Sequence, residues 1–262
     1  MINETDILHT QRVVFVVDAL CDKVINIELA VDLAAAMQSQ LQGLFIEDID
    51  LFNIASLPCS REICLTTGEP RTLSIQQLQK RLNSMADQFR QLLAQKAEQS
   101  VVQWSYTTVR GRKQDLPLGD YSDADYLILE QSAKHLHHST HQSQTKRILL
   151  VEDHSPNLYP ALEVVSRKLS TANLELFITR ASRASLMSEQ ENIWRTAGGL
   201  SQRRHISIVN PDQVEQLLIN RADFFDYVLI ARTTETTLLK NIIKWSRCPV
   251  IVVGDNKASP AH

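Results

Sequence analysis

Short apolar segments alternate along this chain with longer segments of helical periodicity. The apolar segments predict strands at residues 12–18, 42–47, 101–109 and 125–130 in the first half of the chain. Because the clearest of them are continuous apolar runs, they are typical of a parallel sheet that is covered on both faces. The pattern therefore predicts an α/β fold.

Two helices are predicted between the strands of the first half. Within residues 26–40, Ala30, Leu33, Ala34 and Met37 recur with the spacing of one helical face. The longer helix is predicted over residues 74–98, where Ser74 and Gln77 form a capping box. Its apolar stripe consists of Ile75, Leu78, Leu82, Met85, Phe89 and Leu92. We interpret this stripe as a face that lies on the sheet, and a seam for a partner helix is the alternative.

The second half shows the same alternation in a more complete form, with five strands and four helices within residues 147–253. Ser155 and Pro156 predict the start of its first helix. The inward stripe of that helix is Leu158, Leu162, Val165 and Leu169. The first half, by contrast, lacks a fourth helix and a fifth strand before the polar linker 131–146. Its fourth strand is therefore expected to lie at an exposed edge.

Later elements of the second half are also marked in the sequence. Asn210 and Pro211 open a helix that holds Val214, Leu217 and Leu218. A further helix is predicted over residues 235–246, with Leu238, Leu239, Ile242 and Ile243 inward. Pro249 then precedes a closing strand, at a position where no ladder donor is needed.

Three sequence echoes indicate that the two halves arose by duplication. Residues 13–18 (VVFVVD) recur as 148–153 (ILLVED), an offset of 135. Residues 44–46 recur as 176–178, an offset of 132, and residues 125–129 recur as 226–230, an offset of 101. We expect two tandem doubly wound domains, at 1–130 and 147–262, related by a pseudo-twofold axis.

Composition narrows the classes of function. The chain has 262 residues, a net charge of −3 and no basic surplus, which argues against nucleic acid or an acidic membrane surface as partner. No apolar run approaches the roughly 18–20 residues of a membrane span. The acidic start of the chain is unlike a signal peptide, so a cytoplasmic location is expected. The cysteines, at 21, 59, 64 and 248, form no CxxC motif.

Glycine is rare, at seven residues, and none of the seven has the spacing of a GxGxxG or Walker motif. This excludes P-loop NTPases and standard Rossmann dehydrogenases. No HExxH motif, nucleophile elbow or Ser-His-Asp order is present either. The chain is therefore predicted not to be an enzyme.

Two clusters of polar residues remain as candidate sites. The four histidines at 135, 137, 138 and 141 include an i, i+4 pair, but no carboxylate or cysteine completes a metal set nearby. We interpret them as part of a solvated linker, with metal binding as the alternative. Arg110, Arg112 and Lys113 form a basic run, interpreted as a solvated turn, with phosphate contact as the alternative.

Several segments together resemble the universal stress protein family in its tandem form. They are the first strand ending in Asp18, VEDHS at 151–155, DYVLIA at 226–231 and SRCPVIVV at 246–253. The resemblance implies a doubly wound fold of the adenine nucleotide alpha hydrolase type. It implies adenine-nucleotide binding in some members and nucleotide-free signalling in others.

The family's ATP-binding members carry a glycine-rich segment after the fourth strand, and this chain does not. Its fourth strands continue into EQSAK at 130–134 and ARTTE at 231–235. Side chains there keep the backbone from wrapping a triphosphate. The resemblance places Asp18, Asp153 and Ser155 near the ligand position. Ala231 and Thr233 follow the fourth strand of the second half.

Residues 146–158 also resemble the start of a response-regulator receiver, which needs a phosphoacceptor Asp and a Lys after the fifth strand. Asp212 lies at a helix start instead, and Lys257 lacks its usual context. The favoured hypothesis is thus a non-enzymatic, stress-associated regulatory binding protein without a cofactor, whose ligand or partner sits at the carboxyl ends of the strands. One alternative is an adenine-nucleotide (ATP or AMP) binder with a non-standard phosphate site. The other is a scaffold that forms a homodimer or binds a protein partner.

Overall fold

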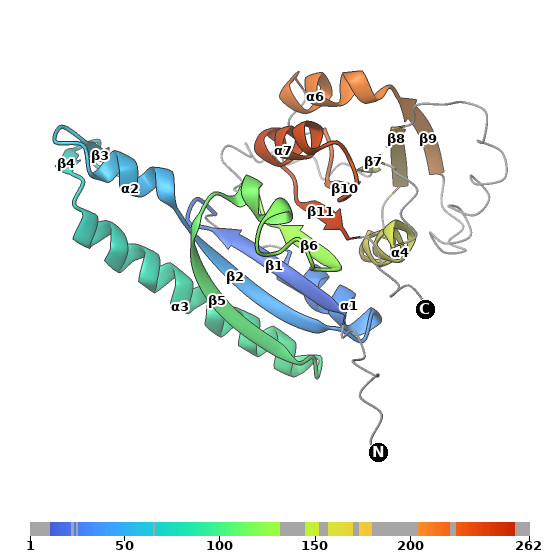
Figure 1. Cartoon of the computed structure of the whole chain (residues 1–262), viewed down its shortest axis with the longest axis horizontal. Helices are drawn as coiled ribbons and strands as arrows, with labels where there is room; N and C mark the ends of the chain where they lie inside the picture. Colours follow the sequence, from blue (N-terminus) through green and yellow to red (C-terminus); the bar gives the residue numbers. More distant parts are fainter. Residues whose placement is uncertain are drawn as a thin grey trace, which may run out of the picture.

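The computed structural model describes residues 11–21, 24, 26–64, 66–131, 145–151, 157–169, 173–179, 204–220 and 224–254. Nine strands in this part of the chain form one sheet. They are β1 (Arg12–Asp18), β2 (Gln40–Asp48), β5 (Trp104–Gly111), β6 (Tyr126–Leu129), β7 (Thr145–Val151), β8 (Asn173–Thr179), β9 (Arg204–Val209), β10 (Tyr227–Ala231) and β11 (Val250–Val253). The order across the sheet is β5-β2-β1-β6-β11-β10-β7-β8-β9 (Figure 1). The α/β fold with a mostly parallel sheet is as predicted.

β11 lies at the centre of this sheet, and the order of strands reads alike from either edge. β11 is parallel to β10 and antiparallel to β6. The expectation of an exposed edge at the fourth strand is therefore wrong, because β6 is paired with β1 on one side and with β11 on the other. The closing strand of the second half supplies the neighbour that the first half lacks. The sheet is continuous across the predicted linker, whose last two residues belong to β7.

The strand register tests the sequence echoes. Val13 pairs with Tyr126, and Ile148 pairs with Tyr227, so the offsets of 135 and 101 describe equivalent positions. The offset of 132 does not. Val13 pairs with Leu41 while Ile148 pairs with Leu176, so Leu176 is equivalent to Leu41 and not to Leu44. A slip of three residues moves a side chain to the other face of the sheet, and Leu44 and Leu176 indeed belong to different cores.

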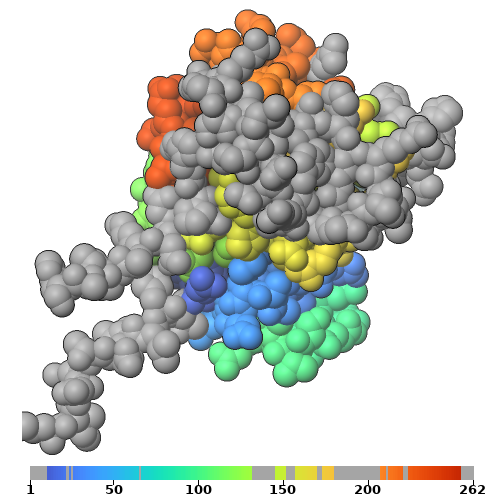
Figure 2. All heavy atoms as spheres, turned by 90° about the vertical axis from the view of Figure 1, so that its right-hand side faces the viewer, coloured from blue at the N-terminus to red at the C-terminus, as the bar shows by residue number. Residues whose placement is uncertain are grey.

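Helices cover the two faces unequally. α1 (Ile27–Ala36), α3 (Ile75–Gln99) and α4 (Leu158–Lys168) pack on one face. α6 (Pro211–Asn220), α7 (Thr236–Trp245) and the 3-10 turn η1 (Lys113–Leu118) pack on the other. Figure 2 shows α4 in yellow against α1 in blue, with α3 in blue-green beyond it. Ser155 and Pro156 lie outside the described residues, but the stripe predicted after them packs inward as expected.

One exposed carboxylate connects these three helices. Glu28 of α1 accepts hydrogen bonds from Lys96 of α3 at 2.9 Å and from Lys168 of α4 at 3.1 Å. These two ammonium groups lower the pKa of Glu28 to about 2. Because the group is exposed, water screens the pairs and their contribution to stability is small.

The stripe of α3 is only partly as predicted. Leu82 and Phe89 are buried, but Ala86, Leu93 and Ala97 complete the buried face. Gly43 on β2 lets α3 pack closely on the sheet, because a Cβ at this position would overlap the side chain of Leu93. Ser74 is the N-cap residue, although its side chain makes no capping hydrogen bond, so the capping box is not formed.

The missing helix of the first half has a local reason. On the face of β2 and β5 away from α3, polar side chains replace apolar ones: Gln42 lies beside Ser105, and Thr107 follows two residues later. The Gln42 amide donates to the Thr107 hydroxyl at 3.5 Å. This polar part of the face needs no covering helix, whereas Leu44 and Ile46 further along β2 are buried in the core against which Leu116 of η1 packs.

The sequence did not predict the segment between β2 and α3. It contains α2 (Ile49–Ala55) and a hairpin of β3 (Arg61–Ile63) and β4 (Pro70–Thr72). We call residues 49–74 the arm. Figure 1 shows the arm and the start of α3 extending beyond the sheet. The arm accounts for the longer first half, since 55 residues separate β2 from β5 and 24 separate β8 from β9.

Candidate functional site

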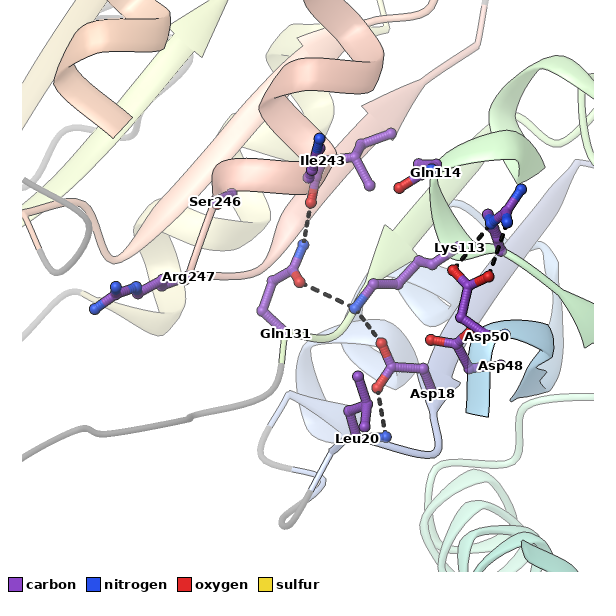
Figure 3. Close-up of a pocket in the computed structure, with 12 residues that line it drawn as sticks. Asp18, Leu20, Asp48, Asp50, Lys113, Gln114, Gln131, Ile243, Ser246 and Arg247 are labelled. Atoms are coloured by element: carbon purple, nitrogen blue, oxygen red, sulfur yellow. Dashed lines mark hydrogen bonds and ion pairs between the residues drawn. The ribbon is translucent and has the colours of Figure 1, made fainter. Parts of the chain in front are cut away.

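A cavity of about 480 Å³ lies at the carboxyl ends of β1, β2 and β6, where the strand order of the first half reverses (Figure 3). Such a reversal is where open α/β sheets bind ligands. The C-terminal end of α7 forms the opposite wall. The lining residues are Asp18, Leu20, Asp48, Asp50, Arg112, Lys113, Gln114, Gln131, Ile243, Lys244, Ser246 and Arg247. We call this cavity the strand-end crevice.

Lys113 fills the floor of the strand-end crevice. Its ammonium lies 2.6 Å from the Asp18 carboxylate, and the two side chains are only 13% and 10% exposed. The same Nζ donates to the Glu130 backbone carbonyl at 2.8 Å and to Gln131 Oε1 at 2.9 Å. Figure 3 shows Lys113 pointing between Asp18 and Gln131. All three ammonium donors thus have acceptors within the protein.

The acceptors of Lys113 are themselves held in place. Asp18 Oδ1 accepts the Leu20 backbone N–H at 3.0 Å, which orients the carboxylate at the strand end. Gln131 Nε2 donates to the Ile243 carbonyl of α7 at 3.2 Å. A chain of polar contacts therefore runs from β1 through Lys113 to α7. It joins the strand ends of the first half to a helix of the second.

The other two cations of the basic run are also paired. Arg110 bonds Glu47 through Nη2 at 2.8 Å and Nε at 3.1 Å, and its guanidinium lies 3.8 Å from the centre of the Phe52 ring. Arg112 bonds Asp50 through Nη2 at 2.8 Å and Nε at 3.0 Å. This hydrogen bond lowers the pKa of the Asp50 carboxyl.

Of the basic run, Lys113 is largely buried, whereas Arg110 and Arg112 are about half exposed. Each of its three cations is neutralised by a carboxylate of β1, β2 or α2. The position of Asp50 follows from the local chain, since the Asp48 carboxylate accepts the Asp50 N–H at 2.9 Å and so caps α2 where β2 ends.

A buried polar network lies behind the strand-end crevice. The Glu130 side chain, in a residue only 2% exposed, accepts hydrogen bonds from the backbone N and from Nδ2 of Asn26, both at 2.9 Å. Tyr227 of the second half donates to Asn26 Oδ1 at 2.8 Å. Desolvation raises the pKa of the Tyr227 hydroxyl, which keeps it a neutral donor.

A comparable hydrogen bond runs from the first half of the chain to the second. Tyr126, the register equivalent of Tyr227, donates to the Asn157 carbonyl of the second half at 3.3 Å. Burial raises the pKa of Tyr126 to about 12. Asn26 and Asn157 are the N-cap residues of α1 and α4, so each half sends one tyrosine to the first helix of the other.

The residues predicted to bind a ligand were expected in two crevices, one in each half of the chain. Asp18 lies in the strand-end crevice, as expected. Ala231 and Thr233 lie at the other end of the strands, where β6 begins, because β10 and β6 run in opposite directions. Ala231 is fully buried and Thr233 is exposed. Asp153, Ser155 and the four histidines of the linker lie outside the described residues.

Arg232, between Ala231 and Thr233, is used in joining the halves. Its Nη2 donates to the Ala124 carbonyl at 2.7 Å, and its Nη1 donates to the Ser122 carbonyl. Its backbone N–H donates to Val253 at 2.8 Å. This guanidinium therefore binds the backbone at the amino end of β6.

Sequence reasoning missed the roles of Glu130, Gln131, Asn26 and Tyr227. The one available signal was the DYLIL and DYVLI pair, which marks equivalent tyrosines but not their acceptors. Among the described residues, no group of three His, Cys, Asp or Glu side chains is arranged to hold a metal ion. Within the same residues, no helix has both the length and the apolar content needed to cross a bilayer.

Comparison with known proteins gave no sequence match, either to a protein-family model or to a curated protein. Solved structures with a similar fold include a universal stress protein from Archaeoglobus fulgidus, which is 12% identical with a TM-score of 0.40, over 93% of this chain and 97% of that one. The cytoplasmic domain of a prokaryotic cation chloride cotransporter is also 12% identical, with a TM-score of 0.42, over 94% and 96% of the two chains. Identities this low say nothing about function.

Proposed function

We propose that this chain is a non-enzymatic regulatory binding protein of the universal stress protein type that does not bind ATP. The observation that carries the proposal is the Lys113 ammonium on the floor of the strand-end crevice. It is held by Asp18, the Glu130 carbonyl and Gln131. A nucleotide bound there would meet a Lys113 ammonium that Asp18 already neutralises.

The cations on the strand side of the strand-end crevice support the same proposal, and the exposed Lys244 and Arg247 on its α7 side are tested by the variants below. A triphosphate needs backbone N–H groups or unpaired cations. Arg110 and Arg112 already bond Glu47 and Asp50, and Asp18 is engaged with Lys113 and so is not available as a general base. A cavity of about 480 Å³ is within the usual size for small-molecule sites, so a polar ligand other than a nucleotide polyphosphate fits it best.

The experiment is a thermal unfolding series of the full chain with millimolar ATP, ADP and AMP. A ligand at 100 times its Kd stabilises the folded state by about 2.7 kcal/mol, which moves the midpoint visibly. We expect no shift with any of the three nucleotides. A shift with ATP in the wild type would overturn the proposal and favour the adenine-nucleotide alternative.

A matched pair of variants shows where such a shift arises. Lys244→Glu/Arg247→Glu reverses two exposed cations of the strand-end crevice, and Arg61→Glu/Arg90→Glu makes the same change in net charge elsewhere. If ATP stabilises the control double variant but not the crevice variant, the nucleotide binds in the crevice. Native mass spectrometry of the purified chain then checks for a retained small molecule in the same pair.

We also propose that the chain is a tandem duplication with a pseudo-twofold axis through β11. Two sets of reciprocal contacts support it. The Arg12 backbone N–H donates to the Asp125 carboxylate, and the Asp125 N–H donates to the Arg12 carbonyl. Arg147 and Asp226 form the same two hydrogen bonds. Tyr126 and Tyr227 each reach the other half. An experimental structure in which β1, β2, β5 and β6 fail to superpose on β7, β8, β9 and β10 would overturn this.

A further inference from the structure

A second hollow, of about 550 Å³, lies on the arm, between its hairpin and the first turns of α3. Its lining residues are Glu62, Arg71, Thr72, Gln77, Lys80, Arg81 and Ser84. Residues 77, 80, 81 and 84 form one stripe of α3, opposite the stripe that contains Leu82 and Phe89. The hollow is therefore an outward-facing groove, which we call the arm groove.

The arm groove has a surplus of positive charge. Arg81 bonds Glu62 with both guanidinium nitrogens, one of them at 2.8 Å, and this pair lowers the pKa of Glu62 and raises that of Arg81. Arg71 lies opposite Glu62 across the hairpin. Neither Arg71 nor Lys80 forms an ion pair with any residue that the structure describes. Three cations thus face one carboxylate.

Apolar side chains are exposed on the same arm. Ile54, Leu57 and Ile63 are 50%, 55% and 68% exposed, and Ile75, at the start of α3, is 47% exposed. Ile63 follows Glu62 on β3 and pairs with Pro70 across the hairpin, so its side chain is on the face of the hairpin away from the groove. These apolar side chains are on the arm but outside the lining of the groove, so the charge of the groove is what indicates its ligand.

We propose that the arm groove binds an acidic segment of a partner protein. Its carboxylates pair with Arg71 and Lys80. Hydroxyl and amide groups of Thr72, Gln77 and Ser84 provide partners for the peptide backbone. The net charge of the whole chain is −3, so an extended anionic surface such as RNA or a lipid bilayer is repelled overall, whereas a short acidic segment meets only the local surplus.

The proposal is independent of the strand-end crevice and of its ligand. Full chain is immobilised and a random peptide display library is selected on it. We expect the enriched peptides to be rich in Asp or Glu. The tightest one, labelled with fluorescein, is then measured by anisotropy against the full chain and its variants.

The decisive variant is Arg71→Glu/Lys80→Glu, which reverses the two unpaired cations. We expect it to weaken the peptide by about tenfold or more, because reversed charges repel the carboxylates. The matched control is Arg61→Glu/Arg90→Glu, which makes the same change in net charge on the same hairpin and helix, outside the groove lining. We expect this control to bind within about twofold of wild type. Circular dichroism and the unfolding midpoint verify that both variants fold.

Several outcomes overturn the proposal. Selection that yields no peptide, or peptides without acidic residues, contradicts the charge argument. Equal weakening by the two double variants shows a general charge effect with no role for the groove. A dimer in light scattering that Arg71→Glu/Lys80→Glu abolishes identifies a second copy as the occupant. Binding of RNA or of phosphatidylserine vesicles that only this variant loses identifies a different class of partner.

Discussion

The strand-end crevice and the arm groove have similar sizes and both contain arginine and lysine, yet their charges are used in opposite ways. On the strand side of the strand-end crevice, Lys113 and Arg112 each have a carboxylate partner from another element, while Lys244 and Arg247 are exposed on its α7 side. In the arm groove, Arg71 and Lys80 have none among the described residues, and only Arg81 is paired. A cation that is paired with a carboxylate of the same chain acts as a structural contact. A cation without such an ion pair is available to bind another molecule.

The difference follows from where each region lies in the fold. The strand-end crevice lies where β1, β2 and β6 end together, so carboxylates of several strands converge on any cation that enters. The arm extends beyond the sheet, and the partly exposed Glu62–Arg81 pair joins its hairpin to α3. Four predictions test this comparison.

The largest effect is expected from Lys113→Met. Removal of one partner of a buried ion pair leaves the Asp18 carboxylate uncompensated, at a cost of roughly 3–5 kcal/mol. Lys80→Met in the arm groove is the matched control and should change the free energy of unfolding by less than about 0.5 kcal/mol. Urea unfolding of both variants measures the difference. Adding Asp18→Asn to Lys113→Met should recover part of the loss, and equal losses for the two single variants would refute the contrast.

A smaller effect is expected from Tyr227→Phe, which tests how far the rigid network of the strand-end crevice extends. It leaves the buried Oδ1 of Asn26 without its donor, at a cost of about 1–2 kcal/mol. Tyr126→Phe removes a longer bond, of 3.3 Å, to a backbone carbonyl and should cost less. If Tyr126→Phe is the more destabilising change, the network is not what holds the two halves together.

The third effect is on reactivity at the hairpin of the arm. Hydrogen bonds from Thr66 and Thr67 lower the pKa of the Cys64 thiol to about 6. Alkylation by iodoacetamide in a Cys59→Ser background should therefore rise steeply from pH 5 to 6 and level off above pH 7. Thr66→Val should move the midpoint upward. A rate that keeps rising to pH 9 would show that the thiol is not ionised at neutral pH.

The smallest effect is expected from Arg112→Gln at the rim of the strand-end crevice. Both partners of the Arg112–Asp50 pair are about half exposed, so the unfolding midpoint at pH 7 should hardly move. A carboxyl whose pKa is lowered on folding stabilises the folded state above its ordinary pKa, here 3.8, and loses that stabilisation as the pH falls. Arg112→Gln should raise the pKa of Asp50, measured by carboxyl carbon NMR. An unchanged pKa would mean that the pair does not persist in solution.

Much of the fold was predictable, because its signals are local. The stripe of Leu158, Leu162 and Val165 buries on the sheet as its spacing indicates, and β1 and β10 match continuous apolar runs. The arm was not predictable, since strands of three residues carry no usable periodicity. The similarity of residues 44–46 to 176–178 gave a wrong correspondence, because short apolar segments recur by chance. Only the strand register shows which positions are equivalent.

The candidate site was less predictable than the fold. Asp18 was found from its place at a strand end, but nothing in the sequence indicates that Lys113 reaches it or that Gln131 joins both to α7. Ala231 and Thr233 were predicted at the end of the fourth strand of the second half, whose crevice is separate from that of Asp18. Because β6 pairs antiparallel with β11, the strands of the two halves end on opposite sides of the sheet, and Asp18 is far from Ala231 and Thr233.

The sequence by itself determined which segments are buried strands and which helical faces turn inward, because side-chain periodicity and burial act within each segment. Only the tertiary structure decided that β11 lies between β6 and β10, and which carboxylate neutralises which cation. Strand pairing and ion pairing depend on distances between segments that are remote in the chain. Those distances exist only once the whole sheet has formed.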